Sequence, residues 1–201
     1  VLSYKPQFFI LIPLVLFVGR YWKALFATLA SAAACVALSL AAFGINPWLD
    51  FIRNLPLART GMLESATDRW FGVMHTVFSA VRMLGGNVQT AYVLQTTVSV
   101  LSVFLLMYFW SRKSASLAVR GASLCAVLLL ASPYSFGYDQ VVLAIPIALL
   151  AMEGTKTGFL PYEKIFLFAL WLLPTLAKDH GEHFALPLTP PMLMVLLVYC
   201  W

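Results

Sequence analysis

A lysine and a proline stand together at the start of the first apolar stretch, in the sequence Tyr4-Lys5-Pro6-Gln7. Proline at this position predicts the first turn of a helix, whose free backbone amides carry partial positive charge. Lys5 adds a full positive charge beside them, and a phosphate group would neutralise both. The alternative is a lysine that extends to the lipid headgroups at a membrane interface. These residues alone leave the two interpretations open.

A second set of polar residues recurs with helical spacing between residues 65 and 86. We predict that this segment forms one surface helix, which begins at Ser65. At 100° per residue, one side of this helix is a polar stripe of Asp68, Gly72, His75, Ser79, Arg82 and Gly86. The opposite side then comprises Trp70, Val73, Val77, Val81 and Leu84. In one interpretation the stripe is the solvated face of an interfacial helix. In the other, His75 and Arg82 line an outward cavity, and the glycines leave room for a substrate.

The segment Ser132-Pro133-Tyr134-Ser135-Phe136-Gly137-Tyr138-Asp139 predicts a short turn between two apolar stretches. Asp139 is placed to cap the helix that follows, a role worth about 1 kcal/mol. Its position between Tyr138 and Gln140 also suits a hydrogen-bonding site at the membrane edge. The capping role is the first interpretation and the site is the second.

Metal ligands of suitable type occur close together in Asp179, His180, Glu182 and His183. A short loop has no fixed helical register, so this spacing does not define a coordination geometry, and a polar turn is the favoured interpretation. The sequence also contains no glycine-rich phosphate loop, no nucleophile elbow and no HExxH motif. We therefore predict no cofactor; a divalent metal is chemically possible but unsupported.

One of the apolar stretches has a polar face, made by Tyr92, Gln95, Ser99 and Ser102. Polar groups within hydrocarbon turn towards neighbouring helices or a wet cavity. This face therefore predicts the interior of a helix bundle, and it does not identify a ligand.

The elements that must position these residues are membrane helices. Of the 201 residues, 62% are hydrophobic and 10% are charged, and the mean hydropathy is +0.88. A soluble domain of this size has too little interior for so much apolar surface. The apolar stretches are Phe8 to Val18, Ala24 to Phe43, Val88 to Trp110, Leu117 to Ala131, Val141 to Met152, Ile165 to Ala177, and Leu186 to Trp201. We predict an all-α, polytopic transmembrane bundle of about seven membrane helices, forming a single domain over residues 1–201.

Basic residues in alternate short loops predict the orientation of this bundle. They are Arg20 and Lys23, then Arg112, Lys113 and Arg120, then Lys156 and Lys164, and the positive-inside rule places them in the cytoplasm. Residues 44–87 then form an outward loop with two interfacial amphipathic helices, the first opened by Asn46 and Pro47. Because the basic residues are scattered and form no single patch, they do not favour nucleic-acid binding.

Four segments together carry a resemblance to a known family. They are Tyr4-Lys5-Pro6-Gln7-Phe8, Gly19-Arg20-Tyr21-Trp22-Lys23-Ala24, Ser79-Ala80-Val81-Arg82-Met83-Leu84-Gly85-Gly86, and Ser132-Pro133-Tyr134 leading to Tyr138-Asp139. In order and spacing the chain resembles bacterial polyprenol-phosphate-mannose-dependent mannosyltransferase-like membrane proteins of the GT-C superfold. The resemblance implies sugar transfer from a polyprenyl-phosphate donor to an acceptor, at the outer face of the cytoplasmic membrane.

The resemblance also implies roles for individual residues. Lys5, Gln7 and Arg82 would bind the donor phosphate, and His75 is the candidate catalytic residue. Tyr138 and Asp139 match the motif without an assigned role. The general base is expected in an outward loop upstream of Val1, so we expect this chain to be the C-terminal part of a longer protein and inactive alone. Its expected partners are the lipid-linked donor, membrane lipids and the missing N-terminal part.

Two other functions remain open from the residues. Polar faces within membrane helices also suit a transporter or lipid flippase subunit, whose sequence would contain inverted repeats. The chain could also be a non-catalytic membrane subunit. An acidic residue in an upstream outward loop would favour the enzyme.

Overall fold

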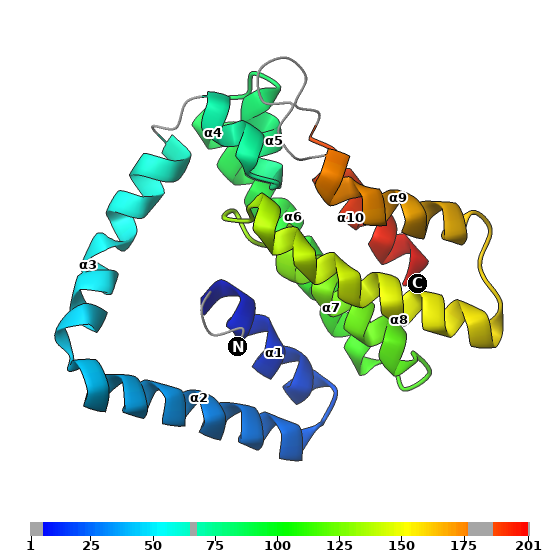
Figure 1. Ribbon diagram of the computed structural model, residues 1–201, viewed down its shortest axis with the longest axis horizontal. Coiled ribbons are helices and arrows are strands. Elements are labelled where there is room, and N and C mark those ends of the chain that lie inside the picture. The colour runs from blue at the N-terminus through cyan, green and yellow to red at the C-terminus, as the bar shows by residue number, and fades with distance from the viewer. Residues whose placement is uncertain (1–5, 65–67, 177–186, 201) are drawn as a thin grey trace. The chain divides into compact units, whose positions relative to one another are not determined.

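The computed structural model describes residues 6–64, 68–176 and 187–200, and the regular elements of this part are helices (Figure 1). The chain divides into two compact units, Val1–Ala66 and Thr67–Trp201, which we describe separately. The all-α class predicted from the apolar stretches is confirmed. The prediction of one transmembrane domain stays a prediction.

The first unit contains α1 (Pro6–Val18), α2 (Trp22–Phe43), α3 (Asn46–Arg59) and a short π-helix, η2 (Thr60–Glu64). Pro6 begins α1, in agreement with the predicted helix start. A tight turn joins α1 to α2, and the amides of Gly19 and Tyr21 donate to the carbonyl oxygens of Val15 and Leu16. The two helices contact each other.

Helix α3 is one of the two amphipathic helices predicted for residues 44–87. It begins at Asn46, so Ile45 takes the cap position that the sequence suggested for Asn46, a difference of one residue. The apolar side chains Phe51 and Ile52 are more than half exposed. An exposed apolar stripe on a polar helix is the pattern expected of a helix that lies on a membrane surface.

The second unit contains α4 (Asp68–Val73), α5 (Val77–Met83), α6 (Val88–Ser111), α7 (Leu117–Leu130), a 3₁₀ helix η3 (Gly137–Leu143), α8 (Ala144–Thr157), α9 (Glu163–Leu176) and α10 (Thr189–Tyr199). Helix α7 contacts α6, α8 and α10 (Figure 1). It therefore forms the centre of this unit, and most of its side chains are buried.

Three helices in the described part are long and apolar enough to cross a membrane: Trp22–Phe43, Val88–Ser111 and Gly137–Thr157. The other predicted stretches form shorter apolar helices, α1, α7, α9 and α10. Each predicted stretch thus contains a helix. Helices this short cross a bilayer only by thinning it or by packing against longer neighbours.

The prediction of one continuous helix over residues 65–86 is wrong. Residues 65–67 lie outside the described part, α4 ends at Val73, and α5 begins at Val77. Thr76 between them has extended backbone angles, φ −121° and ψ 162°. A projection at 100° per residue is invalid across this break, so the single polar stripe does not exist. Val77 is buried and Leu84 is 77% exposed, although the projection placed them on one side.

Candidate functional site

The break between α4 and α5 pairs with the turn at residues 132–139. Met74 and Phe136 form an isolated antiparallel bridge, and the His75 amide donates to the carbonyl oxygen of Ser135 at 2.8 Å. The His75 imidazole lies against Gly137. A Cβ atom added to Gly137 would be 3.4 Å from Nε2 of His75. We call this meeting of residues 74–76 with residues 132–139 the junction. It joins two segments that the sequence analysis treated as separate motifs.

A cap at the start of α5 fixes one side of the junction. The Ser79 amide donates to Oγ1 of Thr76 at 3.0 Å, and the Thr76 amide donates to Oγ of Ser79 at 3.1 Å. The Ser79 hydroxyl also donates to the Met74 carbonyl oxygen at 2.7 Å. These reciprocal bonds satisfy the amides of Thr76 and Ser79 and hold the extended backbone at Thr76, next to His75.

Gln95 of α6 connects the two sides. Its Oε1 accepts from the Phe78 amide at 3.0 Å, and its Nε2 donates to the Leu130 carbonyl oxygen at 3.1 Å. Ser99 adds a bond from its hydroxyl to the Ala131 carbonyl oxygen at 2.9 Å. The polar face predicted on this helix therefore does turn to the bundle interior. It positions the end of α7, from which the turn of the junction departs.

Asp139 performs a structural role at the start of η3. Its Oδ2 accepts from the Phe136 amide at 2.8 Å, and the side chain is almost fully buried. This contact is the half of a capping box that an acidic side chain supplies. Asp139 therefore takes part in a helix cap, as the first interpretation held, but as the third residue of η3, with Phe136 in the cap position. Tyr138 points the other way: it is 63% exposed and its ring stacks on Phe136 with centroids 5.6 Å apart.

Arg82 lies near the opposite end of α5 from His75. Its Nη1 donates to the Gly86 carbonyl oxygen at 2.9 Å, and its guanidinium lies over the Phe71 ring, 5.1 Å from the centroid. The buried Nε has no partner among the described residues. His75 precedes α5 and Arg82 lies in its last turn, so the rise of the helix places the two residues about 10 Å apart along its axis. The structure therefore gives no support to a shared stripe for these two side chains.

Several predicted residues fall outside what the structure describes. Lys5 lies in residues 1–5, and the segment Asp179 to His183 lies in residues 177–186. Gln7 lies in α1, but its side chain is not among those described. Among the described residues, no group of three or more His, Cys, Asp or Glu side chains could hold a metal ion.

Burial changes the chemistry of His75. Loss of hydration lowers the pKa of the imidazole below its ordinary value of 6.5. At neutral pH the ring is therefore uncharged, with one nitrogen that donates a hydrogen bond and one that accepts. A neutral imidazole of this kind is suited to hydrogen bonding and proton transfer, and it provides no permanent positive charge.

Two buried polar atoms, one in the junction turn and one just after it, were not predicted from the sequence. Oγ of Ser135 and Oε1 of Gln140 are buried without a partner among the described residues. Nε2 of Gln140 donates to Oγ1 of Thr189 at 3.1 Å, which ties η3 to the first turn of α10. No local signal marks these positions, because the bond joins residues far apart in the chain.

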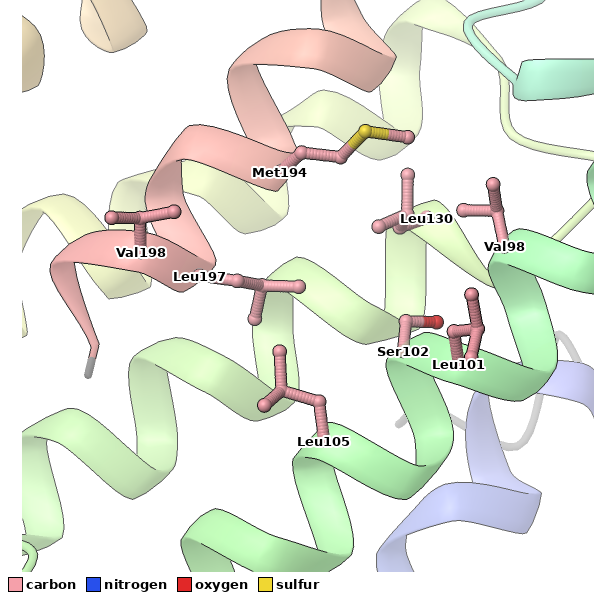
Figure 2. A pocket seen from close by; sticks show the side chains of 8 residues that line it. All are labelled: Val98, Leu101, Ser102, Leu105, Leu130, Met194, Leu197 and Val198. Carbon is pink, nitrogen blue, oxygen red and sulfur yellow. The ribbon is translucent and has the colours of Figure 1, made fainter.

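An apolar cavity of about 380 Å³ opens beside α6, α7 and α10. Figure 2 shows Leu105 on α6, Leu130 on α7 and Met194 on α10 among the side chains that line it. The hydroxyl of Ser102, also in the lining, donates to the Ser99 carbonyl oxygen at 2.9 Å. Leu130 is the last residue of α7, so one end of the cavity lies close to the start of the junction turn.

Apolar helices that enclose a polar junction define an α-helical integral membrane protein with a candidate site at one end of its bundle. A model of the family described as Glycosyltransferase family 87 matches residues 1–133. The chain belongs to this family, and this membership favours the enzyme over the transporter or flippase. No curated protein and no solved structure matches the chain. The matched range includes His75 and Arg82 and ends at Pro133, within the junction turn.

Proposed function

We propose that this membrane glycosyltransferase uses a polyprenyl-phosphate sugar as donor, mannose being the first candidate sugar. The transfer would take place at the outer face of a bacterial cytoplasmic membrane, in a GT-C-like bundle. Family membership supports the transferase reaction. The observation that carries the donor assignment is the junction, where His75 meets the Gly137 turn close to one end of an apolar cavity.

The cavity has the chemistry that an isoprenoid chain requires. Its volume of about 380 Å³ lies within the range of roughly 300–1,000 Å³ common for ligand pockets. The lining is Leu, Val and Met apart from Ser102, and that hydroxyl is already bonded within α6. An apolar chain would therefore enter without leaving a polar group unsatisfied. The headgroup of the same lipid would then lie at the end where Leu130 leads into the junction.

His75 is the residue at the junction best suited to act on the headgroup. Its neutral imidazole offers one donor and one acceptor at the surface of the Gly137 turn. Asp139 is committed to the Phe136 amide and is buried, so we propose that a carboxylate outside the junction supplies the general base. Lys5, Gln7 and Arg82 remain the proposed ligands of the donor phosphate.

The test is transfer of labelled sugar by the full-length protein reconstituted in lipid. Polyprenyl-phosphate mannose and polyprenyl-phosphate glucose are compared with a nucleotide-linked mannose. His75→Ala should reduce transfer from the preferred lipid donor by about 100-fold, the lower end of what general acid or base catalysis contributes. Gln89→Ala, an exposed polar position at the start of α6, is the matched control and should leave transfer unchanged. Transfer from the nucleotide sugar alone would refute the lipid donor.

A further inference from the structure

A second cavity, of about 440 Å³, lies at the other end of the second unit. Its walls come from the last turns of α6, α8 and α10, from the loop between α6 and α7, and from the start of α9. Phe109 lines this cavity, whereas Gln95 on the same helix lies at the junction. About 20 Å of helix separates the two residues. The cavity is therefore distinct from the candidate site.

Two carboxylates line this cavity without a cationic partner among the described residues. Glu163 is 5% exposed, and its Oε2 accepts from the Leu160 amide at 2.7 Å. Its other oxygen has no hydrogen bond within residues 6–64, 68–176 and 187–200. Glu153 is half-buried, and its carboxylate has neither a hydrogen bond nor an ion pair in that same part of the chain. Neither free oxygen belongs to the fully buried atoms without a partner, so both remain accessible to a donor that enters the cavity.

The size and lining of the cavity favour an organic cation over a metal ion. A space of about 440 Å³ is far larger than one ion needs, and the described residues hold no group of three metal-binding side chains. Phe109 and Leu150 form a buried apolar floor beside the carboxylates. Arg112 also lines the cavity, so positive and negative charge are both present. A ligand with an ammonium group, an anionic group and hydrocarbon matches this combination.

We propose that this cavity binds the headgroup of an aminophospholipid. The primary ammonium group, with three N–H donors, would bind between Glu153 and Glu163, and the phosphate would lie on the side of Arg112. Lys156 in the last turn of α8 and Lys164 in the first turn of α9 flank the loop beside the cavity, and the positive-inside rule assigns such helix ends to the cytoplasm. The ligand would therefore come from the inner leaflet, opposite to the proposed transfer reaction. This inference does not depend on the identity of the sugar donor.

Lipid retention by the full-length protein tests the inference. The protein is reconstituted in nanodiscs with equal amounts of phosphatidylethanolamine and phosphatidylcholine of the same acyl chains, and bound lipids are counted by native mass spectrometry. Phosphatidylcholine is the matched probe because its quaternary ammonium has no N–H donor. We expect the wild-type protein to retain the ethanolamine lipid about tenfold more than the choline lipid, since one charge-assisted hydrogen bond contributes roughly this factor.

Glu153→Gln and Glu163→Gln should each reduce this preference, and the double variant should abolish it. The side-chain amide oxygen that Glu163→Gln introduces still accepts from the Leu160 amide, so α9 keeps its start, and thermal unfolding in phosphatidylcholine checks that the variants fold. Asp50→Asn, an acid-to-amide change on exposed α3, should behave like the wild type. An unchanged preference in the folded double variant overturns the site. Displacement of the lipid by soluble glycerophosphoethanolamine would overturn the bilayer lipid as its source.

Discussion

Replacing Gln95 by leucine should separate the two sides of the junction. The substitution keeps the approximate size of the side chain and removes its two bonds to other elements, with the Phe78 amide and the Leu130 carbonyl oxygen, and a third bond to Ser99 on the same helix. A buried group left unsatisfied costs about 1–3 kcal/mol in general. Polar interactions between membrane helices are weaker, about 0.6 kcal/mol on average and at most about 1.7. For the two bonds that leave α6 we expect a loss of about 2 kcal/mol in the free energy of unfolding, because Ser99 still donates to the Ala131 carbonyl oxygen without its bond from Gln95.

The assay is reversible unfolding of the full-length protein in mild detergent, followed by sugar transfer under conditions where the variant is folded. Gln89→Leu is the matched control, because the same change is made at an exposed position of the same helix. Gln95→Glu, at a pH where the carboxyl is protonated, keeps an acceptor for the Phe78 amide and an O–H donor for the Leu130 carbonyl oxygen, so it should retain most of the stability that Gln95→Leu loses. If Gln95→Leu and Gln89→Leu unfold within about 0.5 kcal/mol of each other, within the range of ordinary surface substitutions, Gln95 does not hold the junction.

Three further predictions concern orientation, pH and the donor phosphate. Cysteines introduced at Gly61 or Gly137 should react with an impermeant reagent in intact cells and one at Ser114 should not; labelling at Ser114 would reverse the predicted orientation. Burial lowers the pKa of His75, so the neutral imidazole should contribute fully to stability above pH 6.5 and lose that contribution as the pH falls through the lowered pKa. In thermal unfolding, His75→Gln should make the stability less dependent on pH over this range. Lys5→Met should weaken binding of a polyprenyl-phosphate ligand by about 2 kcal/mol, measured by calorimetry, and unchanged binding would leave Lys5 as an interfacial anchor.

The helices were predictable because hydrocarbon imposes a simple rule on the sequence. Each long apolar stretch must satisfy its backbone internally, so it forms a helix wherever it occurs. The start of α3 and the cap formed by Asp139 were also predictable, since both depend on residues close together in the chain. Local chemistry of this kind is visible in the sequence without knowledge of the fold.

The break before α5 was missed because two local signals disagree there. The apolar spacing of Val73, Val77 and Val81 continues through the segment and favours one helix. Thr76 and Ser79 favour a new start, and the bond from the His75 amide to the turn near Ser135 decides between them. That bond joins residues distant in sequence, so periodicity alone could not predict it. The position of His75 against Gly137 depends on the same contact.

Extended backbone within an apolar bundle is permitted only where its polar groups find partners. At the junction the bridge between Met74 and Phe136, the bond to the His75 amide and the cap on α5 provide those partners. A segment held by so many directed bonds has few alternative conformations, and a side chain on it is fixed more closely than one on a mobile loop. His75 therefore stands on a rigid support, and its imidazole packs against Gly137, where a side chain would press on the ring. A transfer reaction requires catalytic groups in fixed positions, and the fixed imidazole makes the junction the first place to look for the sugar donor.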